Sequence, residues 1–572
     1  MPRSACRLWH VPVVGVLLAL AALALLPNPL TFAQATPSAV ALVPGDPWAE
    51  LLPAERAVAA ARFADELSSY RIEAALDPVA GTIAGVAEVR YRNAAEVPLE
   101  EVWFRLFPNA GYYGEGRLAV AGVTAGGAPA ETALALEETA LRVVLPAPLP
   151  AGAATTLRLP FETVVPVDSA GSYGIFGRDT ETGAWVLAGW HPTLAVYDPG
   201  TGWNLTPPSA AGDPTYAASS LFDVRLTLPA EFAVVATGIE VEGEGEVERT
   251  SGVEAEAEAG TGAGARVGTD AEAGVGASTG TGQRIAGDEP VARRFVAGPA
   301  REFTMVVDAT YVPSRVEAGG VAVVAWSEQA QTEMAERAAA RAAADLVAYG
   351  ERFGAYPFRE LELVQAPLAG ALAVAWSGLI FLDGDSLLGT YGEGDSLAFE
   401  TVVAHETAHL WWGALAGTDS NRHPWIQEGL ATVSSLGALA WEGDPAAAEA
   451  SLEVWVLGPA RRLLASGDAV ADRPITEGQD ETVRGLATYG KGSLGFLAIR
   501  EEIGDAAFWA ALGDVAEGWR FRIFAPDDLL AAFERRSGEE LDEVWNEWFA
   551  ETAMTGVKID AVAEGFAEDP PR

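Results

Sequence analysis

The chain has 572 residues, of which 49% are hydrophobic, 9% are aromatic and 20% are charged, and its formal net charge is −43. This length predicts two or more domains, and the apolar fraction suffices for sizeable cores, which excludes a wholly disordered acidic protein. The negative charge repels phosphate backbones and anionic lipids, so nucleic acids and membrane surfaces are poor partners. The single cysteine, Cys6, excludes disulfides and thiolate zinc sites within the chain.

Residues 1–35 are predicted to be a signal peptide. Arg3 and Arg7 precede an apolar run at 13–26, and the AQA string at 33–35 has the small-x-small pattern that signal peptidases recognise. An uncleaved membrane anchor is the alternative, although the run is short for a membrane-spanning helix. We therefore expect an extracytoplasmic protein, either secreted or at the cell surface.

The next part of the chain predicts a β domain. Residues 36–66 form a linker and a short helix, and residues 67–312 alternate apolar and polar positions in short runs separated by Gly and Pro. A tract at about 241–290, rich in Gly, Ala, Glu and Thr, has almost no large apolar side chains. Because such a composition cannot offset its ordering entropy, we expect a disordered acidic insertion there.

The second half of the chain predicts a helix-rich domain. Over residues 313–556 the apolar period changes to about 3.6 residues, and residues 557–572 are expected to form a C-terminal tail. Four long helices are predicted, at 327–352, 397–415, 424–441 and 492–510.

A His-Glu-Thr-Ala-His string occupies residues 405–409. No Gly or Pro interrupts the surrounding segment, so we expect a helix that places His405 and His409 about one turn apart on one face. Two imidazoles in this arrangement can converge on a tetrahedral zinc ion. Glu406 faces the open side of that ion, where it can take a proton from the attacking water and pass it to a leaving amine. The string therefore predicts metal-assisted hydrolysis.

A catalytic zinc ion needs a third protein ligand, and Glu428 is the predicted one. It lies in a second predicted helix that begins at Pro424, and the Gly-, Asp- and Asn-rich connection at 413–423 lets this helix fold back on the first. His423 is the rival third ligand, but the HExxHxxGxxH spacing would require histidine at the position of Leu415. We expect His423 to have a structural role or to support a ligand.

These strings resemble those of the gluzincin zinc metallopeptidases related to aminopeptidase N. The zinc signature of that family is HExxH followed after 18 residues by Glu in a WLNEGFA-like string, and this chain has HETAH at 405–409 and WIQEGLA at 425–431. The resemblance covers residues 69 to about 550. It implies a multidomain fold, β then α+β: an all-β saddle domain followed by a thermolysin-like, mainly helical zinc catalytic domain. The large helical C-terminal domain of longer members has no room here.

The same resemblance assigns a role to Tyr489. The family carries a YxKG string downstream of the third ligand, and its tyrosine hydrogen-bonds the oxyanion of the tetrahedral intermediate; this chain has YGKG at 489–492. A phenol donor aimed at developing negative charge is what amide hydrolysis needs beside the metal. The alternative is a buried aromatic residue at the start of a helix.

The chain departs from the family where aminopeptidases carry a GxMEN-like string. The glutamate of that string binds the free α-amino group of the substrate, and Ala375 stands in its place, with Val374 in the place of the methionine. An ammonium group buried there would lack its counter-charge. Asp383, Asp385 and Glu393 are the candidates to take its place, although acids in turns are more often simply solvated.

The sequence therefore predicts a zinc-dependent metallopeptidase with one zinc ion per chain and a peptide or protein substrate, aminopeptidase N-like but with atypical recognition of the N-terminus. One alternative is a hydrolase of N-blocked, internal or non-peptide bonds. The other is a zinc-containing surface binding protein without catalysis, against which Glu406 argues because a structural site has no use for a base. His191 is expected to be a packed turn residue, and Asn204 begins a glycosylation sequon.

Overall fold

The computed structural model describes residues 46–572 except positions 170, 199, 208, 211–215, 242–288, 395 and 476–479. The predicted signal peptide and almost all of the predicted insertion at 241–290 lie outside the described residues, so both stay predictions. Within the described part, no helix is long and apolar enough to cross a membrane.

A short helical segment precedes the first strand. The 3-10 helix η1 (Pro47–Glu50) is followed by α1 (Pro53–Phe63), where the sequence predicts a short helix. The side chain of Phe63 is buried and its ring meets that of Phe521 edge-on, with 5.5 Å between the ring centroids. This contact fastens the N-terminal segment to the C-terminal half of the chain.

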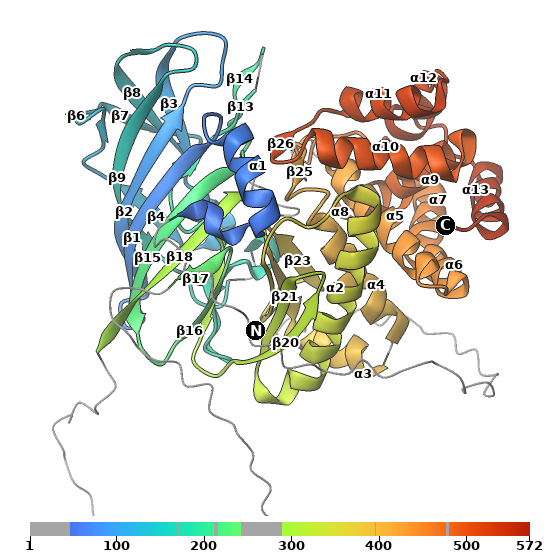
Figure 1. The fold of residues 1–572 in the computed structure, drawn as a ribbon, viewed down its shortest axis with the longest axis horizontal. Coiled ribbons are helices and arrows are strands. Elements are labelled where there is room, and N and C mark those ends of the chain that lie inside the picture. The colour runs from blue at the N-terminus through green and yellow to red at the C-terminus, as the bar shows by residue number, and fades with distance from the viewer. Residues whose placement is uncertain are drawn as a thin grey trace, which may run out of the picture. The chain divides into compact units, whose positions relative to one another are not determined.

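One large mixed sheet, two smaller antiparallel sheets and the two-stranded pair β13 (Tyr197–Asp198) and β14 (Gly202–Trp203) make up the described part of the β domain (Figure 1). Burial along β1 (Ser68–Asp77) alternates from residue to residue, as the period of two predicts. β1 pairs in parallel with β15 and antiparallel with β2 in the largest sheet. The order of this sheet is β17 (Ile239–Val241), β18 (Pro290–Ala300), β15 (Ser220–Pro229), β1, β2 (Thr82–Arg92), β9 (Ala154–Val164), β5 (Thr124–Ala125) and β6 (Ala128–Pro129), with β4 (Arg117–Val120) also on β9.

The two smaller sheets pack their apolar faces into the same core as the large sheet. Ile72 and Val224 of the large sheet and Phe104 of a smaller sheet are all fully buried in this core. The smaller sheets have the orders β12 (Thr193–Leu194), β3 (Leu99–Arg105), β8 (Ala140–Leu149), β7 (Thr132–Ala135), and β10 (Phe176–Arg178), β11 (Trp185–Leu187), β19 (Met305–Asp308), β16 (Ala233–Ala236).

A five-stranded sheet begins the second half of the chain. Its order is β20 (Val312–Ala318), β21 (Val321–Ser327), β22 (Glu360–Ala366), β24 (Leu379–Asp383) and β23 (Ala373–Trp376). β21, β22 and β24 run parallel, and β23 is an antiparallel edge strand. The hydrophobic period did not predict this sheet, because β24 is buried along its whole length and reads as a continuous apolar run.

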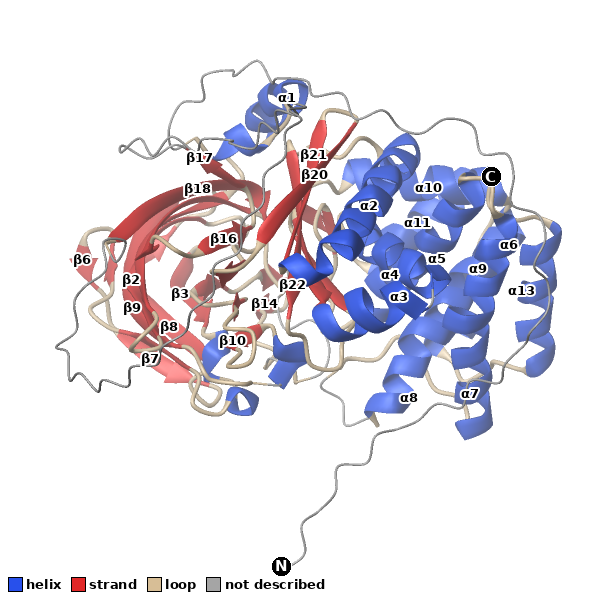
Figure 2. Cartoon of the chain, turned by 90° about the horizontal axis from the view of Figure 1, so that it is seen from below, coloured by secondary structure: helices blue, strands red, loops and turns tan. Residues whose placement is uncertain are grey.

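Helices gather beside this sheet, away from the β domain (Figure 2). They are α2 (Thr332–Phe353), α3 (Gly392–Gly394), α4 (Ser396–His409), α5 (Pro424–Trp441), α6 (Pro445–Leu452), α7 (Gly458–Ser466), α8 (Glu481–Gly485), α9 (Gly492–Ile503), α10 (Asp505–Gly518), α11 (Pro526–Ser537), α12 (Asp542–Trp545) and α13 (Gly556–Glu568). The largest apolar cluster of the described residues joins these helices to the sheet and to Phe63.

Some helix boundaries differ from the prediction. α4 ends at His409, not at 415, and the helix predicted over 492–510 is two helices separated by Gly504 at φ 82°. Glycine adopts that backbone conformation without the strain another residue would carry. The segment predicted as a tail, 557–572, contains most of α13, whose Ile559 and Val562 are buried.

Candidate active site

Three of the predicted ligands come together between two packed helices. His405 and His409 lie one turn apart on α4, and Glu428 lies on α5. The two Nε2 atoms are 3.0 Å apart, and Oε2 of Glu428 is 3.4 Å from each of them. One ligand atom from each residue lies within 4.8 Å of the others, and no other such group of histidine, cysteine or acidic residues occurs in the part of the chain that the structure describes.

Neighbouring groups orient both imidazoles. Nδ1 of His409 lies 3.0 Å from the carbonyl oxygen of Trp412, to which it donates, so in the neutral ring Nε2 carries the lone pair. Nδ1 of His405 lies 3.3 Å from the hydroxyl of Thr432, one turn beyond Glu428 on α5. Such partners fix ring orientation in metal sites. Sequence reasoning missed Thr432, although its spacing of four from Glu428 places it on the same helix face.

The charges of the three groups depend on one another. Burial favours the neutral imidazole of His409, but the Glu428 carboxylate outweighs burial and raises the pKa of His409 to about 9. Burial also acts to raise the pKa of Glu428, and the two imidazoles overcome it and hold that pKa well below its ordinary value. Glu428 therefore remains an anion, as a metal ligand must.

Glu406, next to His405 on α4, is 8% exposed and interacts electrostatically with all three residues of the cluster. Burial raises its pKa, while the two histidines act in the opposite direction. Its carboxylate accepts a hydrogen bond from the backbone N–H of Ala375 on the edge strand β23. A carboxyl group whose pKa lies above the usual range is suited to exchange a proton near neutral pH.

Tyr489 lies beside the cluster in the π-helical segment η8 (Leu486–Lys491). Its ring centroid is 6.2 Å from that of His405, and its side chain is 41% exposed. Desolvation of the hydroxyl and the nearby Glu428 carboxylate hold the pKa of Tyr489 well above its usual value, so the phenol is a neutral donor. Lys491 anchors this segment, because its fully buried ammonium donates to the carbonyls of Ala469 and Glu551 at 2.8 and 2.6 Å.

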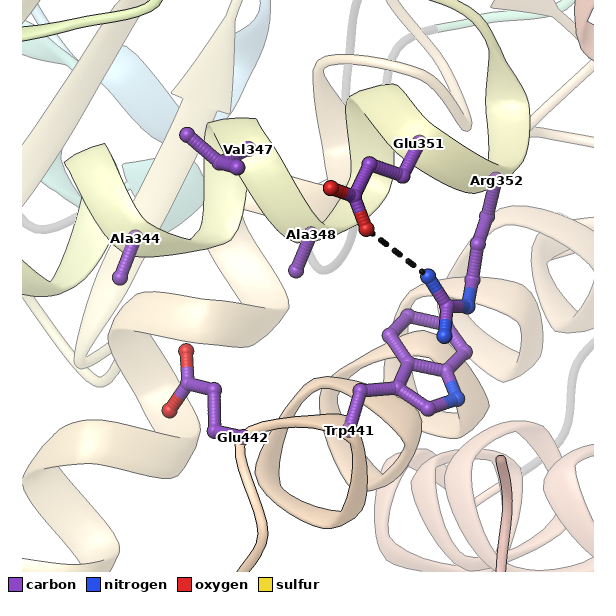
Figure 3. A pocket seen from close by; sticks show the side chains of 7 residues that line it. All are labelled: Ala344, Val347, Ala348, Glu351, Arg352, Trp441 and Glu442. Carbon is purple, nitrogen blue, oxygen red and sulfur yellow. Dashed lines mark hydrogen bonds and ion pairs between the residues drawn. The ribbon is translucent and has the colours of Figure 1, made fainter.

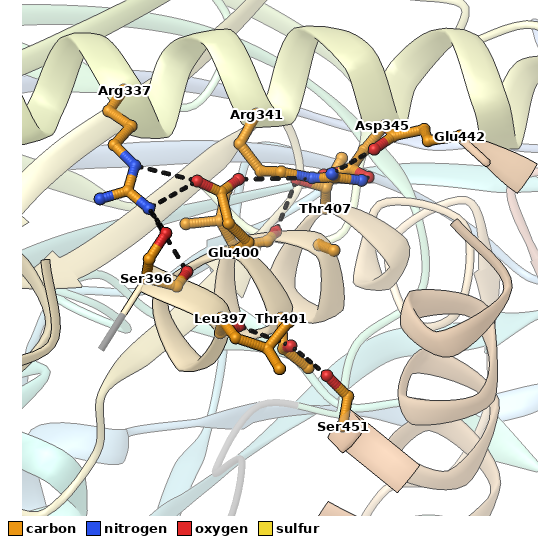
Figure 4. A network of polar contacts seen from close by, with 12 residues as sticks. Arg337, Arg341, Asp345, Ser396, Leu397, Glu400, Thr401, Thr407, Glu442 and Ser451 are labelled. Carbon is orange, nitrogen blue, oxygen red and sulfur yellow. Dashed lines mark hydrogen bonds and ion pairs between the residues drawn. The ribbon is translucent and has the colours of Figure 1, made fainter. Parts of the chain in front are cut away.

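A polar network holds α4 against α2 (Figure 4). Nε of Arg337 donates to Glu400 on α4 at 2.9 Å, and the hydroxyl of Tyr349 donates to the carbonyl of Ala404 at 2.8 Å. Arg341 forms ion pairs with the buried Asp345 and with Glu442 at the end of α5. These bonds fix the position of the helix that presents both histidines.

The rival ligand and the alternative ammonium binder have other partners. Nδ1 of His423 contacts the carboxylate of Asp472, whose Oδ1 also accepts from the indole of Trp425 at 2.9 Å, and His423 is not part of the cluster. Asp383 caps the following segment by accepting from the backbone N–H of Ser386 at 2.7 Å. It also accepts from the backbone N–H of Leu368, earlier in the chain, at 3.0 Å.

Two other residues singled out from the sequence are structural. His191 is 2% exposed, and burial lowers its pKa to about 4, which makes it a neutral core residue. Asn204 is 8% exposed, and its amide nitrogen donates to Asp198 at 3.1 Å and Asp419 at 2.8 Å. The same nitrogen is the atom that a glycan would have to reach.

A separate pocket of about 410 Å³ lies between α2 and the C-terminal end of α5 (Figure 3). The Arg352 guanidinium sits 4.2 Å from the ring centroid of Trp441 and 3.5 Å from the Glu351 carboxylate. None of the residues that line this pocket is a predicted ligand or catalytic group, so the candidate site is the cluster around His405.

Comparisons with known proteins point to one family. Residues 338–548 match the peptidase family M1 domain. Aminopeptidase M1-A of Oryza sativa subsp. japonica is 26% identical over 221 residues, which are 37% of this chain and 25% of that protein. Aminopeptidase N of Streptomyces lividans is 25% identical over 232 residues, 38% of this chain and 26% of that protein. The matched segment thus spans about a quarter of the length of these relatives.

Solved structures match over a larger share. The M1 zinc metallopeptidase of Deinococcus radiodurans has a TM-score of 0.54 at 17% identity, covering 86% of this chain and 95% of that chain. A variant of it bound to a Tyr-Ser-Ala substrate has a TM-score of 0.56 with the same identity and coverage. The predicted fold, an all-β domain followed by a thermolysin-like catalytic domain, is confirmed. Residues 338–548 carry a peptidase family M1 domain, and the predicted relationship of the chain to aminopeptidase N among the gluzincin metallopeptidases is confirmed as well.

Proposed function

We propose that this protein is a zinc-dependent metallopeptidase that hydrolyses peptide bonds, with one zinc ion held by His405, His409 and Glu428. The observation that carries the proposal is the convergence of these three ligand atoms within 4.8 Å. Two imidazoles and one carboxylate, with no thiolate, are the donor set of catalytic zinc sites that keep a fourth position open. Zinc bound there would polarise the scissile carbonyl and make the attacking water more acidic.

Glu406 is the proposed general base and acid. Its buried carboxylate lies next to the ligand cluster and accepts a hydrogen bond from the backbone N–H of Ala375. This bond fixes the carboxylate, so that it can take the proton of the attacking water and return it to the leaving amine. A positioned group of this kind typically contributes about 10²–10⁴-fold to the rate.

Tyr489 is the proposed donor to the oxyanion. The phenol is neutral and lies beside Glu428 and His405. Negative charge develops on the carbonyl oxygen only in the transition state, so a fixed donor there lowers the barrier without strengthening substrate binding.

We further propose that recognition of the substrate N-terminus is atypical. Ala375 is half-buried on β23, and its backbone already faces Glu406. It offers no carboxylate to an α-ammonium group, and an unpaired buried charge costs about 3–5 kcal/mol. N-blocked or longer peptides are therefore the second candidate substrates.

The compartment of the protein is also a proposal. The basic residues and the apolar run of residues 1–35 support a signal peptide and an extracytoplasmic location. A mature chain without cysteine suits an oxidising compartment.

Mass spectrometry of the products from a peptide library tests the proposed function. We expect new peptide ends in the presence of the protein, and no new ends after treatment with a chelator. An intact library with the zinc-loaded protein would contradict the proposal and favour a surface binding protein.

A further inference from the structure

Arg105, at the end of β3, is a buried cation that pairs with no carboxylate among the residues that the structure describes. Its side chain is 3% exposed, and Nε and Nη2 are both buried with no hydrogen-bond partner among the described residues. The guanidinium carbon lies over the ring of Phe107, 5.7 Å from its centroid. Burial lowers the pKa of Arg105 to about 10, so the group stays charged at neutral pH.

Other buried arginines of this chain have the carboxylate partners that Arg105 lacks among the described residues. Arg341 pairs with the carboxylates of Asp345 and Glu442, and Nε of Arg500 donates to Asp505 at 2.7 Å. A buried charge without a counter-charge destabilises the fold, because solvation by water is lost and nothing replaces it. A partner from outside the chain would remove this penalty.

Two further donors lie next to Arg105. The hydroxyls of Tyr112 and Ser172 are also buried. The hydroxyl of Tyr112 interacts electrostatically with Arg105 and shares a hydrogen bond with the side chain of Ser172. Among the described residues no acid pairs with Arg105, so the cluster offers N–H and O–H groups without a counter-charge, which is the composition of an anion site.

We propose that Arg105, Tyr112 and Ser172 form a binding site for a carboxylate. Nε and Nη2 are the two donors on one edge of the guanidinium, and their spacing matches the two oxygens of a carboxylate in a bidentate pair. The Tyr112–Ser172 hydroxyl pair supplies one further donor for a remaining lone pair, because one of its two hydroxyl hydrogens is used within the pair. A carboxylate ion completes the cluster in both charge and hydrogen bonds.

The loop that carries Ser172 connects this site to the candidate active site. Ser172 and Tyr173 have φ angles of 47° and 61°, a backbone conformation that costs energy for residues other than glycine. The carbonyl of Tyr173 accepts from the backbone of Ala369, in the segment that precedes β23, at 2.9 Å. Tyr173 also lies close enough to Tyr489 to affect its phenol electrostatically.

This connection gives the carboxylate two possible sources. One is a small free carboxylate. The other is the C-terminal carboxylate of a peptide substrate, and this second source rests on the proposed peptidase function.

Two measurements distinguish these sources, using wild type, Arg105→Lys and Tyr112→Phe. In the first, thermal unfolding is followed in sodium acetate and in sodium chloride of equal ionic strength. In the second, kcat/KM is measured for matched peptides that end in a free carboxylate or in an amide. Arg158→Lys, on the exposed face of β9, is the control variant.

A free carboxylate predicts that acetate raises the Tm of wild type and of Arg158→Lys above the value in chloride, and that this difference disappears in Arg105→Lys. A substrate carboxylate predicts that the acid-to-amide ratio of kcat/KM falls about tenfold or more in Arg105→Lys. If Arg105→Lys does not fold, Tyr112→Phe should show both effects more weakly. An acetate effect in a protein without hydrolysis would support the site and contradict the peptidase function. No acetate effect and an unchanged ratio would overturn the proposal.

Discussion

Each group with a proposed role in the candidate site is held by a contact of its own. A backbone N–H from β23 fixes Glu406, a buried lysine anchors the segment that carries Tyr489, and the carbonyl of Trp412 sets the tautomer of His409. Residues with fixed positions are what transition-state stabilisation needs, because they do not have to reorganise during the reaction. The individual roles can therefore be tested by substitutions that leave these anchors in place.

Replacement of Tyr489 by phenylalanine removes one donor and leaves the ring to pack. We expect kcat and kcat/KM to fall together by about 10²-fold with KM nearly unchanged, because the hydroxyl acts on the transition state. Steady-state kinetics on a cleaved peptide measures this, with zinc content as the control for an intact site. A kcat close to that of wild type would contradict the proposed role and indicate that Tyr489 only packs against its neighbours.

Replacement of Ala375 by glutamate tests recognition of the N-terminus. Wild type should cleave N-acetylated peptides at least as well as matched free-amine peptides, and Ala375→Glu should shift the preference toward the free amine. Ala375→Gln is the control, since it has the same size without the charge. The idea fails if wild type prefers the free amine by more than about tenfold, which corresponds to about 1.4 kcal/mol.

Local spacing made the ligands predictable, whereas their supports required tertiary structure. The spacing of four from His405 to His409 places both rings on one face of any helix. Glu428 is predicted because the connection at 413–423 lets its helix fold back on the helix of the two histidines. The bond from Ala375 to Glu406 and the unpaired state of Arg105 join segments far apart in sequence, so no local pattern reveals them.

At the scale of elements, close backbone contacts hold the segment of Tyr489 in place. Gly490 of η8 packs against α7, where a Cβ atom would lie 2.7 Å from the backbone nitrogen of Ala460. Gly492 packs against Trp425 on α5, the helix of Glu428. The distance between the phenol and the ligand cluster therefore depends on two glycines in the YGKG string.

Gly490→Ala should push η8 away from α7. We expect a loss of about 1–3 kcal/mol in the free energy of unfolding, because the clash is with backbone that cannot rotate away. The kcat should also fall, since Tyr489 moves with the segment. Urea unfolding and kinetics measure the two effects. Gly485→Ala is the matched control, because nothing lies within 4 Å of its Cβ position; equal losses in both variants would contradict the packing argument.

The hydrophobic period predicted the helix at 424–441 correctly, because α5 has the same bounds. The hydrophobic period failed for the buried strand β24 and for the helix boundary at Gly504. β24 is apolar because both faces of a parallel sheet are covered. The helix boundary at Gly504 depends on a backbone angle and not on polarity.

At the scale of the whole molecule, side chains of the β domain reach the connection between the two ligand helices. Arg301 donates to the carbonyls of Ala414 and Arg522 at 2.9 and 2.8 Å. Asn204 donates to Asp419 at 2.8 Å. Because this connection runs from α4 to α5, the β domain helps to fix the distance between His409 and Glu428.

The N-terminal segment contacts both halves of the chain through Glu50. The strength of this contact depends on pH. It is 2% exposed, its carboxylate accepts from the backbone of Gly298, and Glu360 lies nearby. Burial raises its pKa from the ordinary 4.5 to about 8. Between these two values the folded chain keeps a proton that the unfolded chain releases, so the contribution of Glu50 to stability is complete below pH 4.5 and is lost as the pH rises toward 8.

Glu50→Gln keeps an acceptor for Gly298 and cannot ionise. We expect the free energy of unfolding of wild type, compared with that of Glu50→Gln, to fall by up to about 1.4 kcal/mol per pH unit across this window. Urea unfolding at several pH values measures the difference. Glu66→Gln, which removes an exposed ion pair with Arg522, is the control and should follow wild type. Parallel curves for wild type and Glu50→Gln would contradict the assigned pKa.

The zinc content and the hydrolytic activity of Glu406→Gln, measured on the same preparation, test the central claim most directly. We expect wild type to contain one zinc ion per chain and to cleave peptides. Glu406→Gln should keep the zinc and lose at least about 10²-fold in kcat, because only the base is removed, while His405→Ala should lose both zinc and activity. An active Glu406→Gln protein, or equal zinc loss in the two variants, would contradict the account.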